Sequence, residues 1–447
     1  MGSKQSIQPP MKMPWKDRLL LSLSGLHSLA RRRNGTVNRR LLSLLESYVA
    51  ANPKPVSGVC TSDFPIDSSR NLYVRIFVPS DPSIQARLIP VIVFFHGGGF
   101  CFHSPSSQPY DTLCRRISCE TSAVVVSVNY RLAPEHKYPA AYDDCTDVLR
   151  FLDSEGTRSI DALSNLELDF GNCFLAGDSS GGNIVHHVAR RWAASTQNWK
   201  KIKLAGAILL QPFFGGEERT ESEIRLERAP IISPDKCDWA WKTFLPDDAN
   251  RNHEAAHVFD SIKEGIKEEF PPALVVVGGF DPLHDWQIRY YEALKEKGKQ
   301  VRLVEYPDAL HAFYVFPKIS DTAKLMEEIN GFKSTSGTKT RTENLSHSVC
   351  FACTSIGWGF QGTHRPLRGP PLFVIDGSHV HLHTFVPHMH TSLTYHVSMS
   401  PDGVYFYLEY TPPPPPAPAS PPVPEPSVPP TPVIVISDSD DEGIILE

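Results

Sequence analysis

NCFLAGDSSGGN, at residues 172–183, is the most informative segment of the chain. A short apolar run ends in a glycine- and serine-rich turn, and the residues after the turn place apolar side chains at helical spacing. This pattern predicts a strand, a tight turn and a helix, with Ser179 at the apex and Gly177 and Gly181 two positions away on each side. A nucleophilic serine needs such a turn, because flanking side chains would collide with the neighbouring strand and helix. The first N–H groups of the helix would then face the place where negative charge develops.

A second glycine-rich turn, His96-Gly97-Gly98-Gly99-Phe100, directly follows an apolar run. Consecutive glycines let the backbone approach a substrate closely and point free N–H groups at an oxyanion. We expect the N–H groups of Gly97, Gly98 and Ser180 to form an oxyanion hole with three donors. Losing one such donor typically costs about 3–4 kcal/mol of transition-state stabilisation.

Two further residues complete a set of side chains for nucleophilic catalysis. Asp281 follows the predicted strand Leu274–Val277, and His311 follows the next predicted strand, Val301–Tyr306. Both therefore come from the same edge of the sheet as Ser179, in the order Ser, Asp, His that one class of serine hydrolases uses. We expect His311 to take the proton of Ser179 and deliver it to the leaving group. Asp281 would hold the imidazole tautomer and stabilise the imidazolium.

Other residues compete for the roles of acid and base. Asp285 is an alternative acid, but its position suits a cap for the helix that follows it. His284 and His257 are alternative bases, although His284 lies only three residues past Asp281, too close in sequence for the expected base. We therefore place Asp281 and His311 in these roles.

Strand-like and helix-like runs alternate from about residue 56 to residue 333. Such alternation predicts an α/β fold with a mostly parallel central sheet covered by helices on both faces. Strands are predicted at Leu72–Val78, Val91–Phe95, Ala123–Val128, Cys173–Ala176, Ala207–Leu210, Leu274–Val277 and Val301–Tyr306. Helices are predicted at residues 109–119, 140–153, 183–194, 285–297 and 321–332. Ser179 then lies at the carboxyl end of a central strand, where open α/β sheets place their sites.

The pattern divides the chain into residues 1–55, 56–333 and 334–447. The first part contains two amphipathic helices, at residues 15–30 and 38–49, which must cover an apolar surface. The last part begins with a Ser/Thr/Gly/Lys linker at Lys333–Arg341. From Thr411 to Pro432 it is nearly pure Pro, Ala, Ser and Val, a composition typical of unfolded chain. We predict a helical segment, a catalytic domain and a disordered, low-complexity extension.

Several motifs together resemble the hormone-sensitive-lipase group of α/β-hydrolases. They are His96-Gly97-Gly98-Gly99, Gly177-Asp178-Ser179-Ser180-Gly181-Gly182-Asn183, Tyr130-Arg131-Leu132-Ala133-Pro134-Glu135, Asp281-Pro282-Leu283 and His311-Ala312-Phe313. More narrowly, the chain resembles plant carboxylesterases, and its segment Arg33–Arg39 resembles one that these esterases share with the gibberellin receptors. The resemblance covers about residues 10–333. It implies an α/β-hydrolase fold, a catalytic triad of Ser179, Asp281 and His311, and a lid over the pocket formed by residues 1–55.

The same resemblance supplies an alternative function. Gibberellin receptors have this fold, lack the catalytic histidine and close their lid over bound hormone. This chain keeps His311, which favours turnover, although an intact triad is compatible with a second, binding role. We expect a serine carboxylesterase that hydrolyses short-to-medium carboxylic esters. Aromatic residues near the predicted loop ends suggest an apolar site for them: Phe100, Phe102, Phe213, Phe214, Trp239, Trp241, Phe280 and Phe313.

Charge and cysteine content argue against several other classes of protein. Residues 335–447 carry 4 Lys+Arg and 10 Asp+Glu, which accounts for the whole net charge of −6. Neither part of the chain therefore has the basic character of a nucleic-acid binder. Nine irregularly spaced cysteines favour reduced thiols in the cytoplasm, or alternatively the nucleus. Cys350-x-x-Cys353 lacks a second pair, and His379, His381 and His383 lack a fourth ligand, so we expect no metal and no cofactor.

Both ends of the chain carry motifs outside the resemblance. Gly2 with Ser6 fits the N-myristoylation pattern, although a polar, disordered start is the simpler interpretation and one acyl chain anchors only marginally. We find neither a secretory signal nor a stretch of membrane-spanning length. Val433-Ile434-Val435-Ile436, followed by acidic residues and serines, resembles a SUMO-interacting motif, whose extended run would add a strand to a partner's sheet. A passive acidic tail is the alternative, and a tail that recruits partners is a third candidate function.

Overall fold

A computed structural model of the chain describes residues 29–353, apart from 82–87, 155, 156, 158 and 317, and four strands beyond residue 372. The contacts divide the chain into two units, Met1–Ile356 and Gly357–Glu447. Three predictions lie outside the described residues: the helix at residues 15–30 except for its last two positions, the acylation motif at Gly2, and the SUMO-binding run at Val433–Ile436. They stay predictions.

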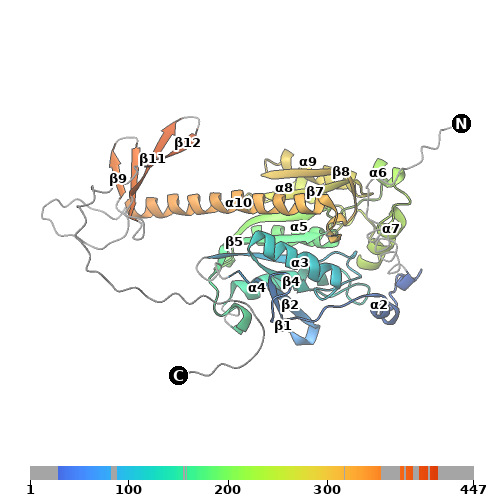
Figure 1. Cartoon of the computed structure of the whole chain (residues 1–447). Helices are drawn as coiled ribbons and strands as arrows, with labels where there is room; N and C mark the ends of the chain where they lie inside the picture. The colour runs from blue at the N-terminus through green and yellow to red at the C-terminus, as the bar shows by residue number, and fades with distance from the viewer. Residues whose placement is uncertain are drawn as a thin grey trace, which may run out of the picture. The chain divides into compact units, whose positions relative to one another are not determined.

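An eight-stranded sheet forms the centre of the first unit, in the order β1-β2-β4-β3-β5-β6-β7-β8 (Figure 1). Strand β2 pairs antiparallel with β1 and β4, and every other neighbouring pair is parallel. This is the sheet of an α/β-hydrolase, so the predicted fold class is confirmed. The strands are β1 (Val59–Asp67), β2 (Leu72–Pro79), β3 (Ile89–Phe95), β4 (Val124–Asn129), β5 (Leu168–Asp178), β6 (Leu204–Leu210), β7 (Ala273–Phe280) and β8 (Val301–Leu310).

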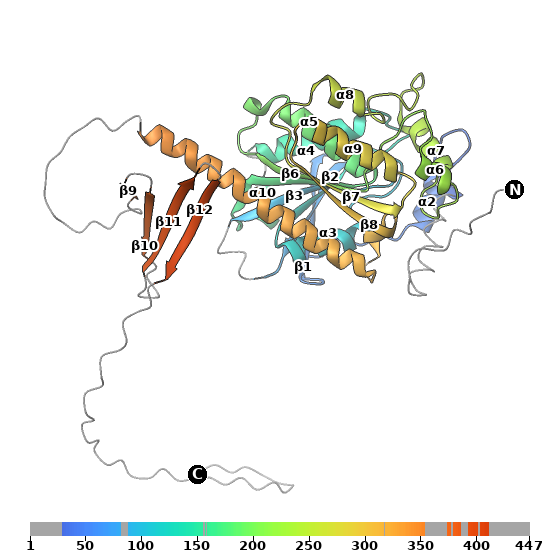
Figure 2. The ribbon, with the colours of Figure 1, turned by 90° about the horizontal axis from the view of Figure 1, so that it is seen from above.

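Helices cover both faces of this sheet, because its strands are apolar on both sides. Along β3, Val91, Val93 and Phe95 belong to one buried cluster, whereas Ile92 and Phe94 belong to a second cluster across the sheet. Figure 2 shows α4, α5, α8 and α9 on one face, and α3 and α10 on the other. The bounds of these helices are α3 (Gln108–Thr121), α4 (Ala140–Asp153), α5 (Ser180–Ala193), α8 (Phe259–Gly265), α9 (His284–Glu296) and α10 (Ser320–Cys353).

Shorter helices lie around the carboxyl edge of the sheet. They are α2 (Arg39–Leu45), α6 (Glu221–Arg225) and α7 (Pro234–Phe244). Helix α2 corresponds to the helix predicted at residues 38–49 and begins at the Asn38 cap, whose side chain accepts the N–H of Leu41. Helices α6 and α7 occupy a connection for which no element was predicted.

The predicted linker at Lys333–Arg341 is wrong, because helix α10 continues through it to Cys353. The Ser, Thr and Gly content of this stretch disfavours a helix on propensity alone. Nevertheless, Ile329 and Phe332 are buried against the sheet, and the ring of Phe332 fills the space above Gly206 in β6. A helix that tertiary packing has nucleated propagates into neighbouring residues at little further cost.

The second unit contains a four-stranded antiparallel sheet in the order β12-β11-β10-β9. Residues 379, 381 and 383 share one face of β10, as residues two apart in a strand must. The register pairs residue 381 with residue 396 of β11. The strands are β9 (Phe373–Asp376), β10 (His379–Phe385), β11 (Ser392–Ser400) and β12 (Gly403–Tyr410).

Candidate active site

Ser179 occupies a strained turn between β5 and α5. Its backbone has φ 51° and ψ −117°, a combination that costs energy for a residue with a side chain. The flanking glycines make the turn sterically possible. A Cβ on Gly181 would lie 1.9 Å from the carbonyl oxygen of Phe95, and one on Gly177 would lie 2.4 Å from the oxygen of Gly181. The predicted strand–turn–helix is therefore present. Both glycines are needed because a side chain at either position would collide with the neighbouring backbone, as expected from the sequence.

Ser179, His311 and Asp281 form a continuous chain of hydrogen bonds. The Oγ of Ser179 lies 3.0 Å from Nε2 of His311, and Nδ1 of His311 lies 2.7 Å from Oδ2 of Asp281. All three are buried, with Asp281 fully inaccessible and the serine and histidine less than a tenth exposed. This arrangement suits proton transfer from the serine hydroxyl to an imidazole that a carboxylate orients.

Two buried glutamines, which sequence reasoning missed, hold the acid and the base in place. Gln287 in α9 donates from Nε2 to Oδ2 of Asp281 at 2.9 Å. Gln211, directly after β6, accepts the N–H of Ala312 at 2.7 Å and donates to the carbonyl of Leu310 at 3.2 Å. It therefore binds the backbone on both sides of His311. A polar residue at the end of the apolar strand β6 was the only sequence signal for Gln211.

The predicted three-donor oxyanion hole needs a correction at Gly97. The N–H of Gly97 donates to Oδ1 of Asp178 at 2.8 Å, so it is not free to bind an oxyanion. Within the described part of the chain, no hydrogen-bond acceptor is placed on the N–H groups of Gly98 and Ser180. Gly98 has φ +110°, and a Cβ there would lie 2.4 Å from the carbonyl oxygen of Phe102, so the loop requires glycine at this position.

Asp178, the residue before the serine, connects the parts of the site. Its carboxylate accepts the N–H of Gly97 and the hydroxyls of Tyr110 in α3, at 3.0 Å, and of Tyr314, three residues past His311, at 3.4 Å. Burial raises the pKa of the Asp178 carboxyl to about 6, although the hydrogen bonds from Tyr110 and Gly97 favour its ionised form. The sequence pattern gives this position no role, because G-x-S-x-G leaves it unspecified.

The alternative acid and bases lie elsewhere. Asp285 caps a helix, as expected, but the helix is α6 rather than its own, since Oδ2 accepts the N–H of Ser222 at 2.8 Å. His284 lies beside Asp285 and Glu305, and His257 lies 3.3 Å from Asp260. Among the contacts of the described residues, neither imidazole ring is hydrogen-bonded to Ser179 or to Asp281; only the backbone N–H of His284 reaches the backbone carbonyl of Asp281, at 3.0 Å.

The aromatic residues predicted to line a pocket divide into two groups. Phe213 stacks on Trp241 with ring centroids 4.3 Å apart, and Phe100 packs against both in the buried core. Phe214 and Phe313 are also buried, one in each of the two core clusters. Phe102, Trp239 and Phe280 differ, because they are only partly buried, and the rings of Phe102 and Trp239 stack on each other. They are therefore the members of the set best placed to contact a ligand.

Two cavities among the described residues lie away from Ser179. One, of about 480 Å³, lies between β1, the end of β2 and residues 162–166. The other, of about 420 Å³, lies beside the turn Asn34–Thr36 and the end of α7. In the same part of the chain, no group of three or more His, Cys, Asp or Glu side chains is arranged to hold a metal ion, and no helix is long and apolar enough to cross a membrane.

Comparison with known families agrees with the fold. The family described as alpha/beta hydrolase fold matches residues 92–315, which include Ser179, Asp281 and His311. The family described as carboxylesterase family matches residues 48–134.

The chain belongs to the α/β-hydrolase family.

Its relatives include both enzymes and receptors. Gibberellin receptor GID1C of Arabidopsis thaliana is 43% identical over 318 residues, which cover 68% of this hydrolase-family chain and 90% of the receptor. Carboxylesterase 20 of the same plant is 33% identical over 276 residues, which cover 60% of this chain and 83% of the esterase. Among solved structures, an esterase of the archaeon Pyrobaculum calidifontis matches with a TM-score of 0.57 and 26% identity, over 73% of this chain and 100% of that one. The predicted resemblance to plant carboxylesterases and gibberellin receptors of the hormone-sensitive-lipase group is confirmed.

Proposed function

We propose that this α/β-hydrolase is a serine carboxylesterase with Ser179 as its nucleophile. The observation that carries the proposal is the chain of hydrogen bonds from Ser179 through His311 to Asp281, at 3.0 and 2.7 Å. A serine on a strained turn, a base within hydrogen-bond reach and a buried carboxylate behind the base are the parts that covalent catalysis at serine requires. Esterases and carboxylesterases among the relatives support the same chemistry.

The proposed reaction has two steps. The Oγ of Ser179 attacks the ester carbonyl while Nε2 of His311 takes its proton. The resulting oxyanion is bound by the N–H groups of Gly98 and Ser180 at the start of α5. The tetrahedral intermediate collapses, the C–O bond to the alcohol breaks, and His311 delivers the proton to the departing alkoxide. Water, deprotonated by His311, then attacks the acyl-serine, and the acid leaves as Ser179 regains its proton.

Each supporting residue has a defined task in this reaction. Asp281 stabilises the imidazolium that forms in both steps, and Gln287 keeps one carboxylate oxygen of Asp281 in place. Asp178 holds the backbone of Gly97 and thereby the glycine turn that includes Gly98. We propose short-to-medium carboxylic esters as substrates, because the partly exposed rings beside the glycine turn are apolar.

Binding of a gibberellin-like ligand is the second candidate function. The observation that favours it is the identity of 39–43% to gibberellin receptors of Arabidopsis thaliana and rice, above the 33–36% identity to carboxylesterases. A lid formed by residues 1–55 belongs to this candidate as well as to the esterase. The hydrogen-bonded histidine favours turnover over binding alone.

Two assays separate these candidates. The first is hydrolysis of p-nitrophenyl acetate and butyrate by the full chain, by Ser179→Ala and by His311→Ala. The esterase proposal expects turnover by the wild type and a loss of about 10³-fold or more in both variants. The second is thermal stabilisation by gibberellins, measured on the Ser179→Ala variant. A folded wild type that is no faster than Ser179→Ala overturns the esterase proposal. If gibberellins also stabilise the Ser179→Ala variant, the result supports the second candidate, a ligand-binding protein.

A further inference from the structure

The N-terminal segment Arg39–Val49 contacts the loop that carries Gly98, one of the two proposed oxyanion donors. We call residues 97–107, which connect β3 to α3, the oxyanion loop. We propose that Arg39 and Glu46 are positioning residues, which hold the oxyanion loop in the conformation that binds the transition state. The segment preceding the sheet would then determine the rate of the reaction as well as access to the site. This inference rests on the proposed esterase function.

The oxyanion loop has a costly backbone conformation. Gly98 and Gly99 have φ of 110° and 59°, which glycine tolerates. Phe100 and His103 have φ of 61° and 74°, where a residue with a side chain is strained by about 1–3 kcal/mol each. Such a conformation persists only if surrounding contacts stabilise it.

Arg39 binds the middle of the loop. Its Nη1 donates to the carbonyl oxygen of Cys101 at 2.5 Å, and its Nη2 donates to that of Ala133 at 2.7 Å. Nε and Nη2 also form a fork with the carboxylate of Glu135, at 3.0 and 2.5 Å. A guanidinium that binds two carbonyls and a carboxylate has a single orientation, so Arg39 connects the loop to the segment around residue 133.

Glu46 binds the second half of the loop. Its Oε1 accepts hydrogen bonds from Nδ1 of His103, at 2.8 Å, and from the hydroxyl of Ser107. Its other oxygen accepts the hydroxyl of Tyr48 at 2.9 Å. Although burial opposes ionisation, the bonds from His103, Ser107 and Tyr48 lower the pKa of Glu46 to about 2. A buried carboxylate therefore holds His103, whose ring lies 2.9 Å from the position of a Cβ on Gly98.

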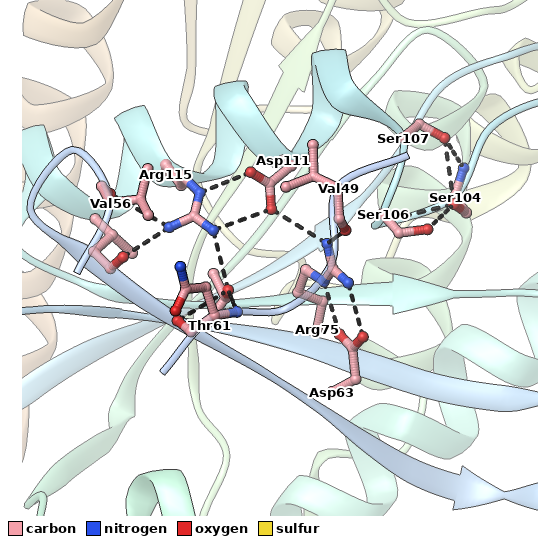
Figure 3. Close-up of polar contacts among 12 residues, drawn as sticks. Val49, Val56, Thr61, Asp63, Arg75, Ser104, Ser106, Ser107, Asp111 and Arg115 are labelled. Atoms are coloured by element: carbon pink, nitrogen blue, oxygen red, sulfur yellow. Dashed lines mark hydrogen bonds and ion pairs between the residues drawn. The ribbon is translucent and has the colours of Figure 1, made fainter. Parts of the chain in front are cut away.

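The segment that supplies these two residues is itself anchored to the sheet and to α3. The carbonyl of Val49 accepts a hydrogen bond of 2.6 Å from Arg75, whose guanidinium is held by Asp63 at 2.7 Å and Asp111 at 3.3 Å (Figure 3). A few residues after this segment, Arg115 binds the carbonyl of Val56 at 3.3 Å (Figure 3). It also binds the carbonyl of Val59 in β1 at 2.7 Å.

Backbone bonds join the same segment to the loop, because the N–H of Val49 donates to the carbonyl of Ser106 at 2.8 Å. The buried Arg75 thus fixes Val49, the same residue of the segment that is bonded to the oxyanion loop.

The test compares Arg39→Met and Glu46→Gln with Arg40→Met in the full chain. Arg40 is the neighbouring arginine in α2 and its side chain is exposed, so its variant controls for the loss of a charge. Two properties are measured. One is kcat and KM for p-nitrophenyl butyrate. The other is hydrogen–deuterium exchange of peptides that cover residues 97–107, which does not depend on activity.

We expect Arg39→Met to lower kcat about 10- to 100-fold with KM within about twofold, because a displacement near 1 Å at the site is sufficient for such a loss. Exchange should rise in residues 97–107 and not in the core strands. Glu46→Gln should also lower kcat with little change in KM, but by a smaller factor, since the amide oxygen still accepts one hydrogen bond. Arg40→Met should have the kcat, KM and loop exchange of the wild type. If Arg39→Met is poorly folded, Arg39→Lys, which retains the charge but not the fork, replaces it.

The outcomes separate this inference from the proposed function. Variants with wild-type kcat and unchanged loop exchange overturn the positioning role while leaving the esterase intact. A general rise of exchange across the sheet also overturns it, because the residues would then only stabilise the fold. A wild type without turnover overturns the esterase. In that case the exchange of residues 97–107 alone decides whether Arg39 and Glu46 hold the loop.

Discussion

Asp178→Asn should change how the stability of the protein depends on pH. Burial raises the pKa of this carboxyl from 3.8 to about 6 in the folded state. The folded protein therefore binds a proton more tightly than the unfolded chain does. The associated stability is present in full below pH 3.8 and is lost as the pH rises through 6. Asparagine has nearly the same shape and does not ionise in this range, so the variant lacks this loss.

The size of the effect follows from the shift. A difference of about two pKa units corresponds to about 3 kcal/mol over the full range, and about 2 kcal/mol of it falls between pH 4.5 and pH 8. In a domain of this size, that is a change of about 4–8 °C in Tm. Any loss of hydrogen bonds to Gly97, Tyr110 or Tyr314 is a constant offset, because it acts at both pH values.

The assay is thermal unfolding of the wild type and Asp178→Asn at pH 4.5 and pH 8. The Tm of the variant, relative to the wild type, should rise by about 4–8 °C from the lower to the higher pH. Asp308→Asn, which changes an exposed carboxyl, serves as control and should show the same difference at both values. A relative Tm of Asp178→Asn that is independent of pH would refute the reasoning, because a buried, ionisable Asp178 requires the shift.

Two further substitutions test the geometry of the site. Asp281→Asn should lower kcat for p-nitrophenyl butyrate by about 10⁴-fold with little change in KM, because the hydrogen bond that orients His311 is reversed; a loss of less than tenfold would exclude Asp281 from the triad. Gly181→Ala should lower the free energy of unfolding by about 3 kcal/mol, because its Cβ would lie 1.9 Å from the carbonyl oxygen of Phe95, which is part of the central sheet and cannot move away. Gly331→Ala, in α10 with open space around it, should instead stabilise the protein by about 0.5–1 kcal/mol in urea unfolding. Equal stability of the two alanine variants would contradict the steric account.

Local patterns in the sequence predicted most of the sheet and its helices. Helix α4 begins and ends where the spacing of apolar residues places it, at 140 and 153, and all strands from β2 to β8 were located. Each of these is a short, strongly apolar or periodic run, so local information suffices. β1 was not predicted, because it is an edge strand that contains Pro65 and several polar residues, a composition that favours a loop.

The sequence predicted those site residues whose role follows from their residue type and their place in a motif. Ser179, Asp281 and His311 were identified from motifs and from their order, and their side chains do meet. Gly97 was assigned as a free donor because a sequence does not show which N–H group is already bonded to a distant carboxylate. Gln211 binds the backbone 99–101 positions away, so no local pattern could reveal it.

Trapping the acyl-enzyme tests the central claim most directly. The wild-type chain is mixed with p-nitrophenyl butyrate, quenched in acid within milliseconds to seconds and analysed by peptide mass spectrometry. We predict a butyryl group on Ser179, formed in a burst stoichiometric with the enzyme and absent from Ser179→Ala. Turnover by the wild type with no acyl group on Ser179, or with an undiminished rate in Ser179→Ala, would contradict the account.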